Sequence, residues 1–385
     1  MIYLDNAATT PVHPEALQAA WPWLTTEFGN PSSTHDLGQR ASVALSEARA
    51  TVATWLDCRP NEVVFTSGGT EGDNLAIMGL ALANPRGRHI ISARTEHEAV
   101  LATIDALVRV HNFAVSWLPV SPTGEVTLAD VSAALRPDTT LVTLMLANNE
   151  IGTIHPIAAI SELAHSVGAL MHTDAVQAAG WLDTRVTALG VDALTLSGHK
   201  LRAPKGSGVV YIRGRLAVEP ILHGGGQEFE RRSGTENVAW AVAFATAISR
   251  LGDPAQEGPR VCSLRDAFIT SVLAAVPRAQ LTGPAANPGA AARHPAIASF
   301  TFAGLNGETL LLELESKGII VSSGSACAAG NTDPSHVLLA VGVDPDVAQT
   351  SVRFSFSHET TVEDLEQTLT ALVDAVAAVS SLRSF

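Results

Sequence analysis

Lysine is nearly absent from this 385-residue chain. Of its 24 lysine and arginine residues only three are lysines, namely Lys200, Lys205 and Lys317. An amine can lose its proton and form a Schiff base with a carbonyl group, whereas a guanidinium cannot. Because Lys200 and Lys205 stand in one short stretch, we expect that stretch to perform chemistry that arginine cannot.

Positive charge is scarce as well. The formal net charge is −14, and no basic stretch is available to neutralise a phosphate backbone, which argues against direct binding of nucleic acid. No apolar run approaches the length that spans a bilayer, and the first residues carry no signal-peptide pattern. We therefore expect a cytoplasmic protein that does not associate with a membrane.

Cysteine is the third scarcity. Cys58, Cys262 and Cys327 are too few and too scattered for a disulfide framework or for a zinc site made of cysteines. In a reducing compartment a free thiol can instead be a working group. Hydrophobic residues, in contrast, are plentiful at 46%, and only 16% of the residues are charged, which favours a compact enzyme. A chain of 385 residues is long enough for two domains.

Short apolar runs alternate with amphipathic stretches over the first two thirds of the chain. This alternation predicts an α/β fold with a largely parallel sheet that is covered on both faces. Strands are expected at 63–66, 89–92, 113–118, 140–146, 169–173, 193–196 and 208–212. Helices are expected at 14–24, 37–56, 98–110, 128–135 and 157–167, with a further helix that ends at 82.

A glycine- and proline-rich segment at 252–259 predicts a hinge that leads to an α+β domain. In that domain we expect helices at 260–275, 307–316, 334–340 and 361–380. Strands are expected at 297–302, 319–321 and 352–356, and a surface loop is expected at 284–295.

Polar side chains follow four of the predicted strands. They are His97, Asn149, Asp174 with Gln177, and Ser197 with His199 and Lys200. Open α/β sheets bind ligands at the carboxyl ends of their strands, so we expect these side chains to line one crevice. Each also has an ordinary alternative, such as a solvated helix start for His97 or a helix cap for Asp174.

The stretch from Ser67 to Asn74 places two glycines and a threonine between a predicted strand and a helix. Backbone N–H groups can converge there on an anion, although an ordinary turn has the same composition. No Lys-Ser/Thr pair follows, so a single phosphate group fits better than a nucleoside triphosphate. A phosphate anchor, an acid and a lysine together suit pyridoxal phosphate.

With these residues, the chain resembles the cysteine desulfurases of the nitrogenase and iron–sulfur-assembly type, within the class V aminotransferase group. The similar blocks are spread over nearly the whole length, at 3–11, 29–33, 64–71, 96–97, 148–152, 174–177, 197–200, 232–235 and 322–327. The resemblance implies fold type I of the pyridoxal-phosphate-dependent transferases. That fold has a large domain, here 15–252, with a mixed, mainly parallel seven-stranded sheet covered by helices. A smaller α+β domain is formed by 1–14 and 259–385.

The resemblance also implies roles for the polar residues of the cofactor site. Lys200 carries the cofactor and acts as a base, His97 stacks on the ring, and Asp174 faces the ring nitrogen. The residues implied to hold the phosphate are Gly69, Thr70, Ser197 and His199, together with Thr235 from the partner subunit of a homodimer. Asn149 and Gln177 lie near the ring hydroxyl or the substrate, and Arg353 binds the substrate carboxylate.

Cys327 stands in a loop, about 322–334, whose small residues resemble those of the long-loop subgroup. The resemblance implies that its thiolate accepts sulfur from L-cysteine, which becomes L-alanine. The persulfide then passes to an acceptor protein, such as an iron–sulfur scaffold, or toward tRNA thiolation. Cys58 and Cys262 fit better as small apolar fillers. Two alternatives stay open. One is a selenocysteine lyase or another class V enzyme in which Cys327 is incidental, and the other is a cofactor-retaining regulatory protein.

Overall fold

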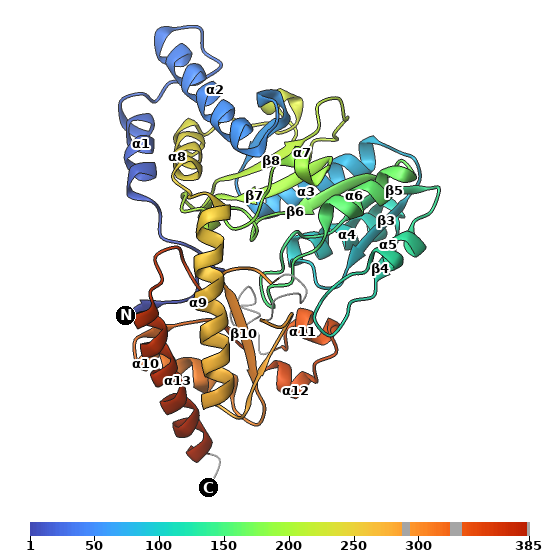
Figure 1. Cartoon of the computed structure of the whole chain (residues 1–385). Helices are drawn as coiled ribbons and strands as arrows, with labels where there is room; N and C mark the ends of the chain where they lie inside the picture. Colours follow the sequence, from blue (N-terminus) through green and yellow to red (C-terminus); the bar gives the residue numbers. More distant parts are fainter. Residues whose placement is uncertain (287–292, 324–332, 383–385) are drawn as a thin grey trace.

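The computed structural model describes residues 1–286, 293–323 and 333–382 (Figure 1). Its largest element is a seven-stranded sheet with the order β2-β8-β7-β6-β5-β3-β4. The strands are β2 (Val63–Thr66), β3 (His89–Ala93), β4 (Ala114–Leu118), β5 (Thr139–Thr143), β6 (Leu170–Asp174), β7 (Ala193–Ser197) and β8 (Gly208–Ile212). Only β8 runs antiparallel to its neighbours, so the predicted mixed, mainly parallel sheet is confirmed.

Both faces of the sheet are covered because successive residues of a strand point to opposite sides. On β7, Ala193 packs in a cluster with Leu75 of α3, while Leu194 packs in a cluster with Ile160 of α6. The helices of this part are α3 (Gly69–Ala83), α4 (Glu98–His111), α5 (Leu128–Ala134), α6 (Ile157–Ser166) and α7 (Val186–Leu189).

Three helices pack together at one end of the sheet (Figure 1). They are α1 (Pro14–Thr25), α2 (Asp36–Leu56) and α8 (Val238–Ser249). The periodic apolar stripe predicts α2 to within one residue of its start. No helix was predicted for α8, because its residues are apolar nearly all round and so carry no helical period.

A second set of elements surrounds its own apolar cluster. It contains the antiparallel sheet β12-β10-β9 and the parallel pair β1-β11. The strands are β1 (Ile2–Tyr3), β9 (Ala279–Leu281), β10 (Ile297–Phe302), β11 (Ile319–Ile320) and β12 (Val352–Ser355). The helices are α9 (Pro254–Ala275), α10 (Gly307–Ser316), α11 (His336–Ala340), α12 (Pro345–Ala348) and α13 (Val362–Leu382). In the described part of the chain no helix is long and apolar enough to cross a bilayer.

Two sequence-based expectations are wrong here. The segment 252–259 is not an irregular hinge, because α9 begins at Pro254. Asp253 caps this helix, and proline is well suited to its first turn. The second error concerns the surface loop predicted at 284–295, of which residues 287–292 are outside the described range. Arg293 and His294 are only 5% and 2% exposed, and Arg293 donates hydrogen bonds to the carbonyls of Pro284 and Ile297.

Candidate active site

Four neighbouring strands bring their carboxyl ends to one edge of the large sheet. In the order β3, β5, β6, β7 these strands are parallel and adjacent. His97 caps α4 after β3, Asn149 follows β5, and Asp174 ends β6. Lys200 lies in the short 3-10 turn that follows β7. The strand ends therefore lie side by side, as the sequence pattern predicts.

The N-terminus of α3 lies at the same edge. Gly208, at the start of β8, has no room for a Cβ atom, which would lie 2.6 Å from the Cα of Gly68. A Cβ on Gly69 would meet Val176 at 3.0 Å and Ser197 at 3.5 Å. No side chain caps α3, so the first N–H groups of the helix are left for an anion.

Asp174 is the buried acid of this edge. Burial raises the pKa of its carboxyl group, whereas His97, the backbone N–H of Val176 and Lys200 act in the opposite direction. The Val176 N–H donates to Asp174 Oδ1 over 2.8 Å. Asp174 thus lies among groups that favour its ionised form, which a cationic ligand would favour further.

Two further carboxyl groups lie beneath the edge. Burial, reinforced by Asp174, raises the pKa of both Asp73 and Glu96 well above the ordinary range. Burial also lowers the pKa of His172 to about 3. Its ring nitrogens lie 2.8 Å from Thr143 Oγ1 and 3.0 Å from Thr195 Oγ1. Burial thus favours the protonated forms of Asp73 and Glu96, and His172 is neutral at neutral pH.

The chain's N-terminal segment reaches into this edge. Residues 5–10, which we name the N-terminal strap, cross between Lys200 and strand β12. The Lys200 amine donates to the carbonyl of Ala7, and to that of Ala8 over 2.7 Å. The amide of Gln177 also donates to Ala7 O, over 2.8 Å.

His199 contacts the same strap. Its Nδ1 lies 3.2 Å from Thr9 Oγ1, and its backbone carbonyl accepts hydrogen bonds from Thr10. Burial, with smaller contributions from Lys200 and Lys205, lowers the pKa of His199 to about 4. The imidazole is therefore neutral at neutral pH and can still donate one N–H.

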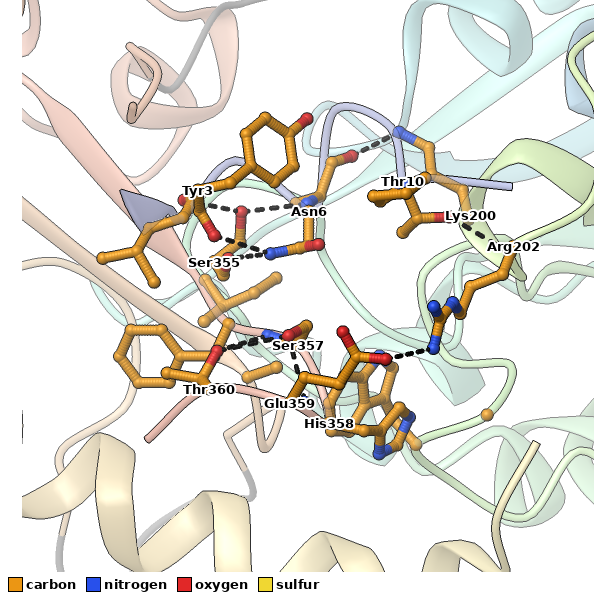
Figure 2. Close-up of a pocket in the computed structure, with 18 of the residues that line it drawn as sticks. Tyr3, Asn6, Thr10, Lys200, Arg202, Ser355, Ser357, His358, Glu359 and Thr360 are labelled. Atoms are coloured by element: carbon orange, nitrogen blue, oxygen red, sulfur yellow. Dashed lines mark hydrogen bonds and ion pairs between the residues drawn. The ribbon is translucent and has the colours of Figure 1, made fainter. Parts of the chain in front are cut away.

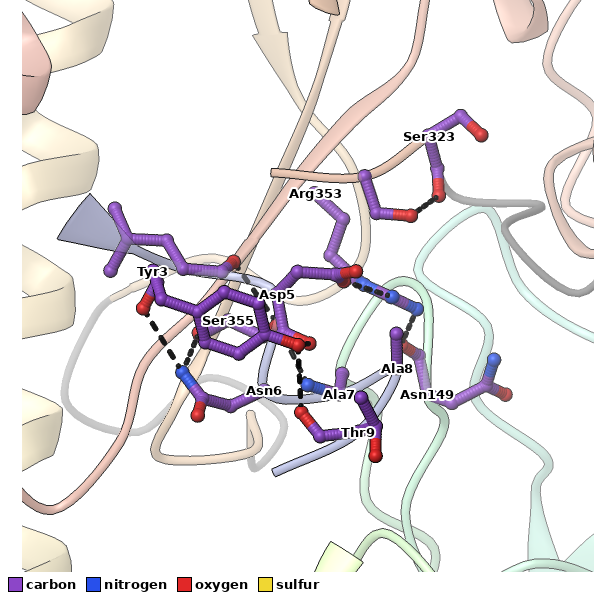
Figure 3. Close-up of polar contacts among 12 residues, drawn as sticks. Tyr3, Asp5, Asn6, Ala7, Ala8, Thr9, Asn149, Ser323, Arg353 and Ser355 are labelled. Atoms are coloured by element: carbon purple, nitrogen blue, oxygen red, sulfur yellow. Dashed lines mark hydrogen bonds and ion pairs between the residues drawn. The ribbon is translucent and has the colours of Figure 1, made fainter. Parts of the chain in front are cut away.

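The other end of the strap holds Arg353, which lies on β12 and is only 2% exposed (Figure 3). Its Nη2 donates to Asp5 Oδ1 over 3.0 Å, and its Nη1 donates to the carbonyl of Asn149 over 2.9 Å. Its Nε has no hydrogen-bond partner among the described residues. A guanidinium is thus fixed next to the loop that follows β5.

The strap is fastened to β12 just beyond Arg353. The amide of Asn6 donates to Ser355 O over 2.9 Å, and the Ala7 N–H donates to Ser355 Oγ over the same distance. Sequence reasoning assigned no site role to residues 5–10. An Asp-Asn pair followed by small residues is typical of an ordinary turn. Residues 3–11 stood out only because they resemble a segment of the cysteine desulfurases.

A cavity of about 270 Å³ lies on one side of the strap (Figure 2). Tyr3, Trp181, Lys200, Arg202 and His358 are among the residues that line it. Trp181 and His358 stack with their ring centres 3.9 Å apart. Lys200 and Gln177 belong to this lining, whereas His97, Asp174 and Gly69 do not, so the cavity meets the edge that carries the predicted cofactor residues only in part.

Thr235 is one predicted site residue that does not reach this edge within the single chain, because it is exposed on the segment before α8. Arg232 pins that segment to the start of α3, because its Nε donates to Glu71 Oε1 over 2.8 Å. Cys327 is outside the described residues. Of the two other cysteines, burial raises the pKa of Cys58 to about 12 and also raises that of Cys262, which makes both poor thiolates.

The sequence profile of the aminotransferase class-V family matches residues 2–368. The chain belongs to this family. It is 43% identical over 373 residues to a cysteine desulfurase IscS of Dictyoglomus turgidum, covering 96% of this chain and 93% of the relative. An IscS-like cysteine desulfurase of Mycobacterium tuberculosis is 43% identical over 384 residues, covering 98% of this chain and 96% of that protein.

Solved structures agree with this class V assignment. A NifS-like protein superposes with a TM-score of 0.89 at 33% identity, covering 98% of this chain and 99% of its own. A structure of SspA in complex with cysteine superposes with a TM-score of 0.80 at 32% identity, covering 92% of this chain and 99% of its own. These neighbours confirm fold type I of the pyridoxal-phosphate-dependent transferases.

Class V aminotransferases depend on pyridoxal phosphate, and the residues present fit this group. The start of α3 has no side-chain cap at Gly68, and its glycines let the backbone come close to a ligand, which suits the phosphate. Asp174, buried beside His97 and Lys200, suits a protonated ring nitrogen. The amine of Lys200, one of only three lysines, is the group able to form a Schiff base.

Proposed function

We propose that this protein is a cysteine desulfurase, which converts L-cysteine to L-alanine and takes the sulfur onto Cys327 as a persulfide. The observation that carries the proposal is the arrangement of Lys200 and Arg353 at the two ends of one strap. A cofactor held at Lys200 would react with the amino group of an amino acid, and the guanidinium of Arg353 would bind its carboxylate. Full-length relatives named cysteine desulfurase support the choice of reaction, and the SspA complex supports the choice of substrate.

The residues that would hold pyridoxal phosphate come from five strand ends, those of β2, β3, β5, β6 and β7. The backbone at Gly69 and Thr70, with Ser197 and neutral His199, would hold the phosphate, joined by Thr235 of a second subunit. Asp174 would face the ring nitrogen, and His97 would lie on the ring. Gln177 and Asn149 would lie near the ring hydroxyl or the substrate. When bound, the cofactor supplies an electron sink for the bond that breaks at the substrate Cα.

Lys200 would move the proton at that carbon. Its amine lies partly buried beside backbone carbonyls and close to Asp174. In its neutral form this amine would accept the Cα proton. His97, at the start of α4, is placed to carry the proton of the substrate thiol. Arg353 would hold the substrate carboxylate through paired N–H groups.

The sulfur step balances without an external oxidant. The thiolate of Cys327 attacks the substrate sulfur, a new S–S bond forms, and the Cβ–S bond breaks. The electron pair and protons stay with the three-carbon fragment, which becomes alanine. The raised pKa values of Cys58 and Cys262 leave Cys327 as the cysteine proposed for this role. An acceptor protein, such as an iron–sulfur scaffold, would then remove the outer sulfur.

We further infer a division into a large domain at 15–252 and a small domain formed by 1–14 and 259–385, with the small domain carrying the segment of about 322–334 that contains Cys327. Two separate apolar clusters support this division. A cytoplasmic homodimer that contributes Thr235 across its interface completes the proposal. The exposed position of Thr235 agrees with such a contribution.

The test is alanine formation from L-cysteine by the cofactor-loaded protein and by Lys200→Ala. We expect the wild-type protein to release alanine and to show the visible absorption of lysine-bound cofactor, and the variant to lose both. Unchanged absorption in Lys200→Ala would contradict the assignment. Release of selenium from selenocysteine with no alanine from cysteine would favour the selenocysteine lyase alternative.

A further inference from the structure

The N-terminal strap accepts hydrogen bonds from both Arg353 and Lys200. Asp5 accepts from Arg353, while the carbonyls of Ala7 and Ala8 accept from Lys200. Only one residue, Asn6, separates the two sets of contacts. The strap therefore connects the strand that carries the guanidinium to the turn that carries Lys200.

Further hydrogen bonds fix the position of the strap relative to β12 and to the turn around Lys200. Ser355 accepts hydrogen bonds from Asn6 and from the Ala7 N–H, which fastens the strap to β12. Thr10 donates to His199 O over 2.8 Å and accepts from the Arg202 N–H over 3.0 Å, which fastens it to the turn around Lys200. The acceptors are the backbone carbonyl and the Oγ of Ser355 on β12, and the backbone groups of His199 and Arg202 lie in the turn that follows β7.

Asp5 provides a charged acceptor for the buried guanidinium of Arg353. A guanidinium buried to 98% loses most of its hydration, and without an acceptor on each side it would be costly and poorly oriented. Asp5 Oδ1 fixes Nη2 and the carbonyl of Asn149 fixes Nη1. Each Nη nitrogen has a second N–H, and Nε keeps its own, so the held guanidinium retains donors for a carboxylate.

An α-amino acid carries its amino and carboxylate groups on the same carbon. A site that selects this class must hold its amine-reacting group and its carboxylate-binding group at a fixed separation. We propose that the N-terminal strap performs this selection and that Asp5 is a positioning residue for Arg353, so that the site favours α-amino acids over amines without a carboxylate. The inference rests on the proposed function and names the element that enforces its substrate class.

The experiment compares two small ligands on the cofactor-loaded protein. L-Alanine has the α-carboxylate, and ethylamine is the same molecule without it. The Kd of each is read from the change that it causes in the visible absorption of the bound cofactor. The ratio of the two Kd values measures what the carboxylate contributes, and it needs no turnover.

In Asp5→Ala we expect the preference for L-alanine to fall by about tenfold while the Kd of ethylamine stays unchanged, because one charged hydrogen bond that orients Arg353 is lost. Asp5→Asn should retain most of the preference, because its amide oxygen still accepts from Nη2. The KM for L-cysteine should rise in Asp5→Ala more than kcat falls. Asp138→Ala, which removes a carboxylate paired with Arg136 on the surface, is the matched control and should bind both ligands normally.

Two results would overturn the inference. An unchanged preference in Asp5→Ala would show that Arg353 needs no positioning by the strap. Tighter binding of L-alanine in both Asp5 variants would show that Asp5 competes with the substrate carboxylate. Arg353→Lys separates this inference from the function itself. If that variant loses the preference and Asp5→Ala does not, only the inference fails, whereas a preference retained in Arg353→Lys removes the proposed carboxylate site and the inference together.

Discussion

Arg353 donates to Asp5 across 348 positions of the sequence, with Nη2 and Oδ1 separated by 3.0 Å. This ion pair joins the first residues of the chain to strand β12, and the Asn149 carbonyl joins the same guanidinium to the large sheet (Figure 3). A buried cation is thus held by two separate parts of the fold. The consequences for substrate binding and for stability can be measured separately.

Arg353→Lys should weaken the binding of substrate more than it slows turnover. An ammonium is a point charge and cannot hold Asp5, the Asn149 carbonyl and a substrate carboxylate in one plane. We expect the KM for L-cysteine to rise by at least about tenfold with a smaller fall in kcat. Steady-state kinetics test this expectation, and an unchanged KM would contradict it.

Asp73→Asn should change how stability depends on pH. In the folded protein burial raises the pKa of Asp73, so the folded state holds a proton that the unfolded chain releases above about pH 4. The wild-type protein therefore loses stability as the pH rises, while the asparagine variant lacks this loss. We expect the free energy of unfolding of the variant, relative to wild type, to increase with pH.

Urea denaturation of the cofactor-free protein at several pH values measures this difference. Glu96 and Asp174 titrate in both proteins, but both interact with Asp73, so Glu96→Gln with and without Asp73→Asn separates the contribution of Asp73. A relative stability of the variant that falls as the pH rises would show that Asp73 is ionised in the folded state.

Arg49→Met should destabilise the fold where α2 meets β2 and the segment that contains Glu228. Arg49 donates to both carboxylate oxygens of Glu228, over 2.6 and 2.8 Å, and both residues are buried. Glu228, Phe229 and Glu230 all have positive φ angles, of 49°, 60° and 66°, which non-glycine residues seldom adopt. Removing one partner of a buried pair costs about 3–5 kcal/mol.

Chemical denaturation measures that cost. Arg136→Met, which breaks the exposed pair with Asp138, is the control and should lose less than about 1 kcal/mol. Equal losses in the two variants would mean that Glu228 does not depend on Arg49 for its conformation.

The sequence predicts the sheet and its polar edge well, for a physical reason. Strands that alternate with helices form a parallel sheet, and parallel strands bring their carboxyl ends together, so His97, Asp174 and Lys200 could be grouped without coordinates. The pairing of Asp5 with Arg353 could not be grouped this way. No local period links residues so far apart, and an acid in a polar turn has many ordinary uses.

Two further features were missed because they depend on burial, namely the inward-facing Arg293 and the helix α8. Arg293 lies in a stretch rich in proline, alanine and glycine that reads as a surface loop, yet the arginine turns inward to satisfy backbone carbonyls. The apolar α8 has no polar face, so its sequence lacks the contrast on which a helical period depends. Both features depend on what packs against the segment, which local patterns do not contain.

The most direct test of the proposed function is to detect sulfur on Cys327. The cofactor-loaded protein is mixed with no more than one equivalent of L-cysteine and no added reductant. Alanine is then quantified, and the mass of the peptide that contains Cys327 is measured by mass spectrometry. The account predicts one alanine for each Cys327 that gains a single sulfur atom, with no gain in Cys327→Ser. Alanine formed at the wild-type rate by Cys327→Ser, or sulfur found on Cys58 or Cys262 instead, would contradict it.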